Sequence, residues 1–247
     1  MTRSSGPTPA ERVRTVLARG GTAQVAADGV PNAPCRVRGL IPDGAIALTA
    51  GSGSSLATLR PGATAVLELL DRSPGVCESV RGLVWIRGRI RPVAAAAMGP
   101  LLDDIAATNP DPGLLDVGHG DLLVLLTIES VVFADAAGAE DVAVDAVRKA
   151  SPDPFSTTES AWVTHLHRHH PELVERLRLR LPRRMRRGRL RLLGLDRYGL
   201  QVRVEGPEGG WDSRIPFFRT ADDESALCRA LMAVMSCPFT HGLRART

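Results

Sequence analysis

Four of the six histidines lie within six positions, in the stretch THLHRHHPELV that begins at Thr164. His165 and His169 stand four residues apart, the spacing at which two helical imidazoles can chelate one metal ion. A tight site also needs a third ligand, and the same helical turns hold no Asp or Glu. His170 falls on the apolar side of the predicted helix, and Pro171 removes an amide that the helix needs, so a kink or restart is expected there. The cluster therefore predicts packing or interface contacts more than a metal or haem site.

Arginines form a second candidate site, on the segment VRGLVWIRGRIRPV. Alternation along a strand places Arg87, Arg89 and Arg91 on one face. Three guanidinium groups in a row could hold a phosphate or a carboxylate, with Arg36 and Arg38 of another strand as contributors. The alternatives are that they are ordinary outward residues, or that they pair with Glu68 and Asp71.

A third basic feature is the run RLRLRLPRRMRRGRLR from Arg176 to Arg191. Clustered arginines can bind a nucleic-acid backbone, but few aromatic residues are available to stack on bases and no nucleic-acid-binding motif is present. Leucines also alternate with the arginines in part of the run. We therefore expect a solvated surface or an acidic protein partner, and no nucleic acid.

The bulk composition is that of a globular protein of 247 residues with 44% hydrophobic and 23% charged residues. The chain begins without a signal-peptide pattern and has no apolar run long enough to cross a bilayer, so we expect a cytoplasmic protein without a membrane partner. The net charge of +4 is unevenly spread. The first 150 residues carry 14 basic and 16 acidic side chains, whereas the remainder carries 17 and 11. The positive charge belongs to the C-terminal part.

The predicted helices and strands fall into two groups along the chain. A capped helix from Thr8 to Gly20 precedes five short β-type segments between residues 22 and 93. A helical segment and a long apolar strand, DLLVLLTIESVVFAD, follow and would complete an antiparallel barrel. We place a first domain at residues 1–150.

The second predicted domain, residues 151–247, contains a helix from about Thr158 to Leu181. Three strands follow it, LRLLGLD, LQVRVEG and WDSRIPF, with a turn after each of the first two. A final helix capped by Thr220 and Asp223 completes it. Helix, three-strand antiparallel meander and helix make a compact module, so the fold class is α+β.

This second module resembles the small domain of unknown function (DUF2470) that accompanies split β-barrels in the HugZ-type haem-degrading proteins and in the plastid glutamyl-tRNA reductase-binding protein. His165, Leu166, His167 and His170 occupy the positions of that domain's His-Met-Asn-x-x-His box. Asp196 with Gly199 matches its first strand turn, and Arg214 with Phe217 matches its third strand. The order of barrel first and module second resembles the plant protein.

The first domain is similar to the FMN-binding split barrels of the pyridoxamine-phosphate oxidase superfamily. The matching order is the capped helix, the stretch DGAIALTAGSGSSLATLRPGATAVLELLD and then VWIRGRIRPV. In that family the segment after the third strand contacts the flavin phosphate, which here assigns Ser54, Ser55 and Arg60 to the cofactor.

These resemblances imply binding of haem or a related tetrapyrrole, with haem oxygenase activity as the enzymatic form of that function. His241, in the tail, corresponds in position to a haem ligand of the bacterial proteins, and His119 in VGHGD is the second choice. A homodimer is implied because split barrels place the cofactor cleft between two barrels. Two alternatives stay open: an FMN-dependent oxidoreductase, and a non-catalytic regulator that docks on a tetrapyrrole-pathway enzyme.

Overall fold

The computed structural model describes residues 6–74, 79–207 and 209–235 and divides into two compact units. The larger unit comprises Thr8–Arg72 and Val80–Pro152. Of the described residues, the smaller unit comprises 153–207 and 209–235, together with 6–7, 73–74 and 79.

The larger unit opens with helix α1 (Pro9–Arg19), whose start is fixed by the predicted capping box. The Thr8 hydroxyl accepts from the Glu11 amide at 3.2 Å, and the Glu11 carboxylate accepts from the Thr8 amide at 2.7 Å. Six strands then build the sheet: β1 (Gly21–Ala27), β2 (Val30–Leu40), β3 (Ala45–Gly51), β4 (Thr64–Arg72), β5 (Val80–Pro92) and β6 (Asp121–Asp135). All pairings among them are antiparallel.

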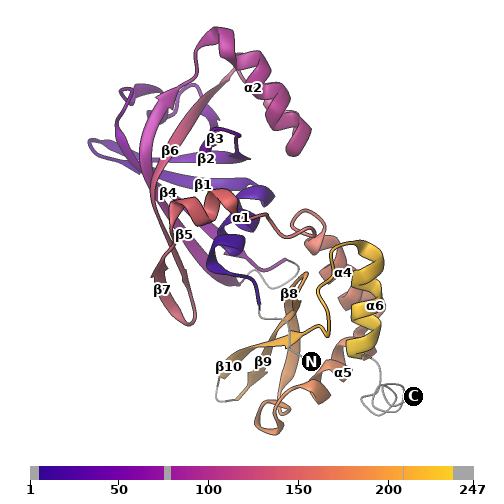
Figure 1. Ribbon diagram of the computed structural model, residues 1–247. Helices are drawn as coiled ribbons and strands as arrows, with labels where there is room; N and C mark the ends of the chain where they lie inside the picture. Colours follow the sequence, from indigo (N-terminus) through magenta and orange to yellow (C-terminus); the bar gives the residue numbers. More distant parts are fainter. Residues whose placement is uncertain (1–5, 75–78, 208, 236–247) are drawn as a thin grey trace. The chain divides into compact units, whose positions relative to one another are not determined.

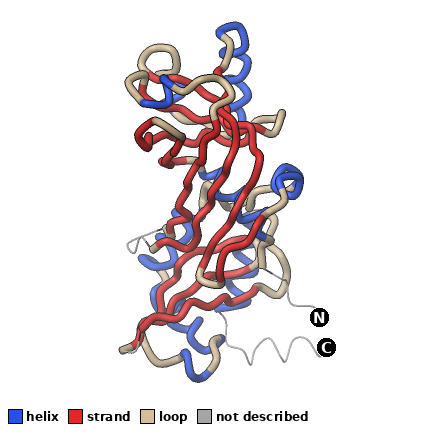
Figure 2. Tube along the Cα trace, turned by 90° about the vertical axis from the view of Figure 1, so that its left-hand side faces the viewer, coloured by secondary structure: helices blue, strands red, loops and turns tan. Residues whose placement is uncertain are grey.

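The sheet closes on itself. The strand order is β3-β2-β1-β4-β5-β6, and β3 pairs with β6 from Ala45 opposite Thr127 to Gly51 opposite Asp121. Figures 1 and 2 show the strands curving around the interior. The predicted α+β fold with a closed barrel is therefore confirmed. Strand β7 (Gly138–Asp141), a hairpin partner of β6, was not predicted, because its four residues are all exposed and GAED has no apolar alternation.

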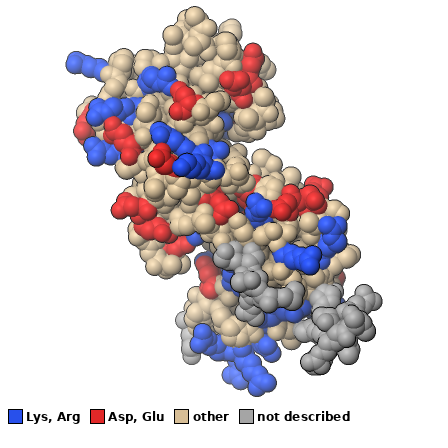
Figure 3. All heavy atoms as spheres, in the orientation of Figure 1, with Lys and Arg blue, Asp and Glu red and all other residues tan. Residues whose placement is uncertain are grey.

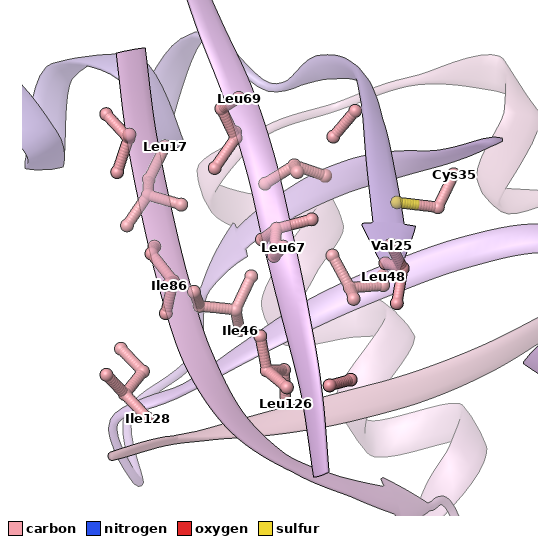
Figure 4. Close-up of a cluster of buried hydrophobic side chains, with 14 of the residues drawn as sticks. Leu17, Val25, Cys35, Ile46, Leu48, Leu67, Leu69, Ile86, Leu126 and Ile128 are labelled. Carbon is pink, nitrogen blue, oxygen red and sulfur yellow. The ribbon is translucent and has the colours of Figure 1, made fainter. Parts of the chain in front are cut away.

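The barrel interior is filled by residues that alternate along the strands with outward side chains. In Figure 4 Leu48, Leu67, Ile86 and Leu126 converge from four different strands, and Leu17 of α1 joins them. These five side chains are fully buried. Burial of apolar surface on this scale is the main stabilising contribution to such a domain.

Four further helical segments lie in the described residues of the larger unit; three are between strands and the last follows β7. They are η1 (Ser55–Thr58), α2 (Ala95–Thr108), η2 (Pro112–Leu114) and α3 (Val144–Lys149). Helix α2 contributes Ile105 to a second apolar cluster on the outer side of β3 and β6, with Ala47 and Leu125. The barrel is thus packed on both faces in this region.

The smaller unit is a three-stranded sheet with helices, as predicted. The strands are β8 (Arg189–Asp196), β9 (Gly199–Gly206) and β10 (Gly209–Pro216), in the order β10-β9-β8. Helix α4 (Glu159–His169), helix α5 (Pro171–Arg176) and helix α6 (Glu224–Met235) share its apolar cluster. Asp223 accepts from the Ala226 amide at 2.7 Å and so begins α6, as the sequence predicts.

One predicted helix is corrected. The segment from Thr158 to Leu181 is not a single helix, because α4 ends at His169 and α5 begins at Pro171. Two 3₁₀ turns follow, η3 (Leu177–Arg180) and η4 (Arg183–Met185). Pro171 cannot donate to the His167 carbonyl, which explains the break that its position predicts.

Candidate functional site

A cavity of about 410 Å³ lies at the end of the barrel where β3 and β5 finish and β6 begins. Its walls come from η1, the end of β5, helix α2 and the start of β6. They are mostly apolar, and the volume falls in the usual range of small-molecule sites. The lining residues are Leu56, Ala57, Leu59, Ile90, Pro92, Val93, Met98, Gly118, Asp121, Leu122, Leu123 and Val124.

Backbone hydrogen bonds bring two distant segments together at this cavity. The Ser52 amide donates to the Gly120 carbonyl at 2.7 Å. Gly118, with φ of 85°, turns the chain so that its amide donates to the Asp121 carbonyl at 2.8 Å. None of the predicted site residues that the structure describes lines this cavity, but Ser55, Arg60 and His119 are next in sequence to lining residues, and Ser54 lies two residues before Leu56.

His119 is exposed on the turn between two lining residues, Gly118 and Asp121. Its backbone amide donates to the Asp116 carbonyl at 3.0 Å, while its ring makes no hydrogen bond to any residue that the structure describes. An imidazole with both ring nitrogens unengaged can ligate a metal or bind a polar group.

The two serines have structural partners. The Ser54 hydroxyl accepts from the Leu56 amide at 3.3 Å and caps η1. The Ser55 hydroxyl donates to the Pro31 carbonyl at 2.9 Å. Their hydroxyls shape the segment that forms one wall of the cavity, and Arg60 is exposed beyond it.

The three β5 arginines lie on the outer face of the strand, opposite the buried Ile86 and Ile90. Arg89 pairs with Glu129 at 2.7 Å and Arg91 with Asp43 at 2.5 Å. Arg87 is exposed and pairs with no carboxylate among the described residues. The strand alternation is confirmed, and these side chains point away from the cavity wall that Ile90 forms.

The expected alternative of pairing with Glu68 and Asp71 is wrong. Glu68 accepts from the Trp85 indole at 2.8 Å. Asp71 binds Arg19 at 2.6 Å and Arg81 at 2.7 Å. Both carboxylates are therefore engaged by other neighbours.

Arg36 and Arg38 meet at Asp111 instead of joining the β5 arginines. Arg38 is 2% exposed, donates to Thr49 Oγ1 at 2.8 Å and pairs with Asp111 at 2.9 Å, whereas Arg36 is 3.4 Å from the same carboxylate. The pKa of Asp111 is lowered, mainly by the hydrogen bond from the Gly113 amide. Burial raises this pKa, but the hydrogen bond from Arg38 and the charges of Arg38 and Arg36 lower it further. Only Arg38 of this group is buried, so we assign the group a structural role as a partly buried ion pair.

The histidine cluster lies on α4 and its end. The His165 ring centroid is 5.0 Å from that of His169 and 5.1 Å from that of His170, and His167 Nε2 lies 3.3 Å from the Leu192 carbonyl. No group of three His, Cys, Asp or Glu side chains in the described residues has a geometry suited to a metal ion. His241 lies outside the described residues.

The sequence did not predict which residues line the barrel-end cavity, and it did not predict a second cavity in the larger unit. The apolar wall residues Leu59, Val93 and Met98 belong to irregular or helical segments that carry no recognisable motif. The second cavity includes Arg14 and Arg148, which are far apart in the sequence. No signal in the sequence predicted that they line one hollow.

Comparisons with solved structures support the fold. A heme binding protein from Mycobacterium smegmatis matches 94% of this chain and 98% of its own, with 18% identity and a TM-score of 0.60. A protein of unknown function from Agrobacterium tumefaciens covers the same shares at 16% identity, but with a TM-score of 0.40. An FAD and heme binding protein from M. smegmatis matches 56% of this chain and 76% of its own at 20% identity, with a TM-score of 0.39. The first similarity shows a shared fold; the other two are too loose to carry an argument.

No family model matches the sequence, and no curated protein is significantly similar to it. None of the helices in the described residues is long and apolar enough to span a bilayer.

Proposed function

We propose that this protein binds haem or a related tetrapyrrole in the barrel-end cavity. One observation carries the proposal: nearly the whole chain shares its fold with a protein described as heme binding, at a TM-score of 0.60. The apolar walls of the cavity suit a macrocycle, and the unengaged ring of His119 on its rim suits the iron. His241, the first candidate ligand from the sequence, stays a prediction because it lies outside the described residues.

The residues present fit haem better than flavin. Ser55, one of the two serines expected to contact a flavin phosphate, donates its hydroxyl proton to the Pro31 carbonyl, and the Ser54 hydroxyl accepts a hydrogen bond as the cap of η1. Arg60 is the exposed cation next to the lining residue Leu59, where a propionate could be bound. Bound haem would supply redox chemistry at iron, while these side chains hold and orient it.

Spectroscopic haemin titration of three variants tests the location of the site. His119→Ala and Leu59→Arg should each weaken haemin binding at least tenfold, because one removes the ligand and the other places a charge in the apolar wall. His165→Ala, an exposed histidine of the smaller unit, is the matched control and should bind as the wild type does. Equal binding by all three variants would place haem elsewhere, and a protein purified with flavin absorbance would favour the flavin function.

Haem degradation is the enzymatic extension of this proposal. Its test is a Soret band that decays when the haem-loaded protein receives a reductant in air, with release of iron to a ferrous chelator. If the Soret band persists and the haem is only reduced, haem degradation is rejected and haem binding is left as the function.

We also propose that the protein forms a homodimer through the outer face of β4, β5 and β6. Leu70 lies opposite Leu83, and Trp85 lies opposite Val132, so an apolar strip crosses three strands. Leu70 is 39% exposed. Apolar side chains gathered on an outer barrel face are typical of a protein interface.

The basic surface of the smaller unit favours a second function, docking on an acidic protein. Figure 3 shows Lys and Arg gathered where the segment between α5 and β8 lies. Arg186 donates to the carbonyls of Leu181 at 2.9 Å and Leu179 at 3.0 Å, which fixes this segment. Four exposed arginines of this segment and of the start of β8 pair with no carboxylate in the part of the chain that is described: Arg183, Arg184, Arg187 and Arg189.

Binding of labelled peptides separates this function from nucleic-acid binding. A glutamate-rich peptide with leucines should bind at physiological salt, and an Arg183→Glu, Arg184→Glu, Arg187→Glu variant should lose that binding. A single-stranded RNA of equal charge should bind more weakly, since few aromatic side chains can stack on its bases. Tighter binding of the RNA would contradict the expected partner class.

A further inference from the structure

The second cavity of the larger unit is about 530 Å³ in volume and lies at the opposite end of β3 from the first. The turn between β2 and β3, from Leu40 to Gly44, forms one wall. The last turns of α2 form another, and α1 and α3 contribute one arginine each, Arg14 and Arg148. Nothing in the proposed tetrapyrrole site uses these residues.

Arg14 is a partly buried cation without a carboxylate partner among the described residues. Its Nε donates to the Ala150 carbonyl at 3.0 Å, which fixes the side chain between α1 and the end of α3. Desolvation by burial lowers the pKa of Arg14. A guanidinium removed from water without a counter-ion is costly, so an anion bound beside it would be favourable.

Arg148 reaches the same cavity from α3. Its nearest acidic group is Asp145, with 3.5 Å between Arg148 Nη1 and Asp145 Oδ1, a loose pair that is largely exposed. A Cβ on Gly44 would lie 2.8 Å from Arg148 Nε. Gly44 has φ of 83°, a conformation that favours glycine, and a side chain there would push the Arg148 guanidinium aside.

The other charges that line the cavity are largely neutralised by neighbours. Arg38 is paired with Asp111, and Asp43 binds Arg91 at 2.5 Å and the Ala45 amide at 2.9 Å. Asp104 is an exposed carboxylate on the wall formed by α2. The lining residues themselves comprise three arginines and two aspartates, an excess of one positive charge. Apolar side chains of Leu40, Ile41, Pro42 and Ile105 complete the lining.

We propose that this cavity binds a small organic anion, whose carboxylate or phosphate lies between Arg14 and Arg148 and whose apolar body rests on the turn after β2. Two guanidinium groups from separate helices are a suitable cradle for such an oxyanion. The volume exceeds what an inorganic ion needs, which is why an organic body is part of the proposal.

Calorimetric titration of the full-length protein tests this site with three probes: phenyl phosphate, phenylacetate and inorganic phosphate. We expect saturable binding of phenyl phosphate or phenylacetate, with inorganic phosphate at least tenfold weaker. Whichever aromatic probe binds more tightly indicates whether the anionic group of the ligand is a phosphate or a carboxylate. Absence of saturable binding by both aromatic probes would overturn the proposal, as would equal binding of inorganic phosphate.

Matched variants identify the residues. Arg14→Gln and Arg148→Gln should each lower the affinity for the probe about tenfold or more. Lys149→Gln removes the same charge from the neighbouring exposed position and should leave binding unchanged. Gly44→Ala displaces the Arg148 guanidinium without changing net charge and should weaken binding too. If Lys149→Gln weakened binding as much as the two arginine variants, the effect would be one of net charge and the proposed site would be rejected. Circular dichroism of each variant verifies that it is folded.

Discussion

Individual buried carboxylates organise the turn between β8 and β9. Asp153 accepts from the Arg197 amide at 2.8 Å and the Phe155 amide at 2.9 Å, and Glu159 accepts from the Leu195 amide at 3.0 Å. Asp196 accepts from the Tyr198 amide at 2.8 Å and also pairs with Arg214. Asp196 and Arg214, two of the positions on which the predicted resemblance rests, therefore meet at this turn.

Asp153 gives this turn a predictable pH dependence. Burial, with smaller contributions from the charges of Asp196 and Glu159, raises the pKa of Asp153 to about 6 against the opposing amide hydrogen bonds. In the unfolded chain an aspartate releases its proton near pH 3.9. Between about pH 4 and 6 the folded state therefore holds more protons, and the free energy of unfolding of the smaller unit should fall as pH rises.

Urea unfolding at pH 4.5 and 6.5 measures that slope. Asp153→Asn should be less stable at pH 4.5 by about 1 kcal/mol, because an amide oxygen replaces only one of two acceptors. Its stability should then change less between the two pH values than that of the wild type. Parallel changes in the two proteins would mean that Asp153 titrates normally.

At the scale of elements, the pairing of β5 with β6 depends on a bulge. Arg87 lies opposite Ser130 and Gly88 opposite Ile128, so Glu129 is the extra residue. A Cβ on Gly88 would lie 2.1 Å from the Thr127 carbonyl oxygen, a backbone atom that cannot move without breaking the pairing. The bulge and the glycine together allow the two longest strands to stay paired while the sheet curves.

Gly88→Ala should therefore destabilise the barrel by about 2–3 kcal/mol. Gly99→Ala in α2 is the matched control, since a Cβ there would meet nothing within 4 Å, and it should be neutral or slightly stabilising. Thermal unfolding followed by circular dichroism compares them. Similar melting temperatures for the two variants would show that the β5–β6 pairing tolerates the added methyl group.

The sequence predicted elements well where alternation or capping was strong. Strands β1 to β6, the capping box of α1 and the break at Pro171 follow from local patterns. Strand β7 could not be predicted, since GAED is short and polar. The groupings of Arg38 with Asp111 and of Arg14 with Arg148 could not be predicted either, because they depend on which distant segments meet. The sequence therefore predicted candidate site residues one at a time, whereas the cavities near them could be found only in the structure.

For the whole molecule, the outer apolar strip makes a prediction about assembly. In light scattering coupled to gel filtration the wild type should elute with the mass of a dimer. Leu70→Arg should give a monomer, because it places a charge in the apolar strip. Leu115→Arg changes a side chain that is 81% exposed elsewhere in the same unit and should remain dimeric. A wild-type monomer at micromolar concentration would contradict the proposed assembly.

A haemin titration of the wild-type protein tests tetrapyrrole binding itself. We expect a saturable shift of the Soret band with one haem per chain, and a spectrum typical of histidine ligation to iron. Absence of a saturable shift, or a spectrum identical to that of free haemin at every ratio, would contradict tetrapyrrole binding.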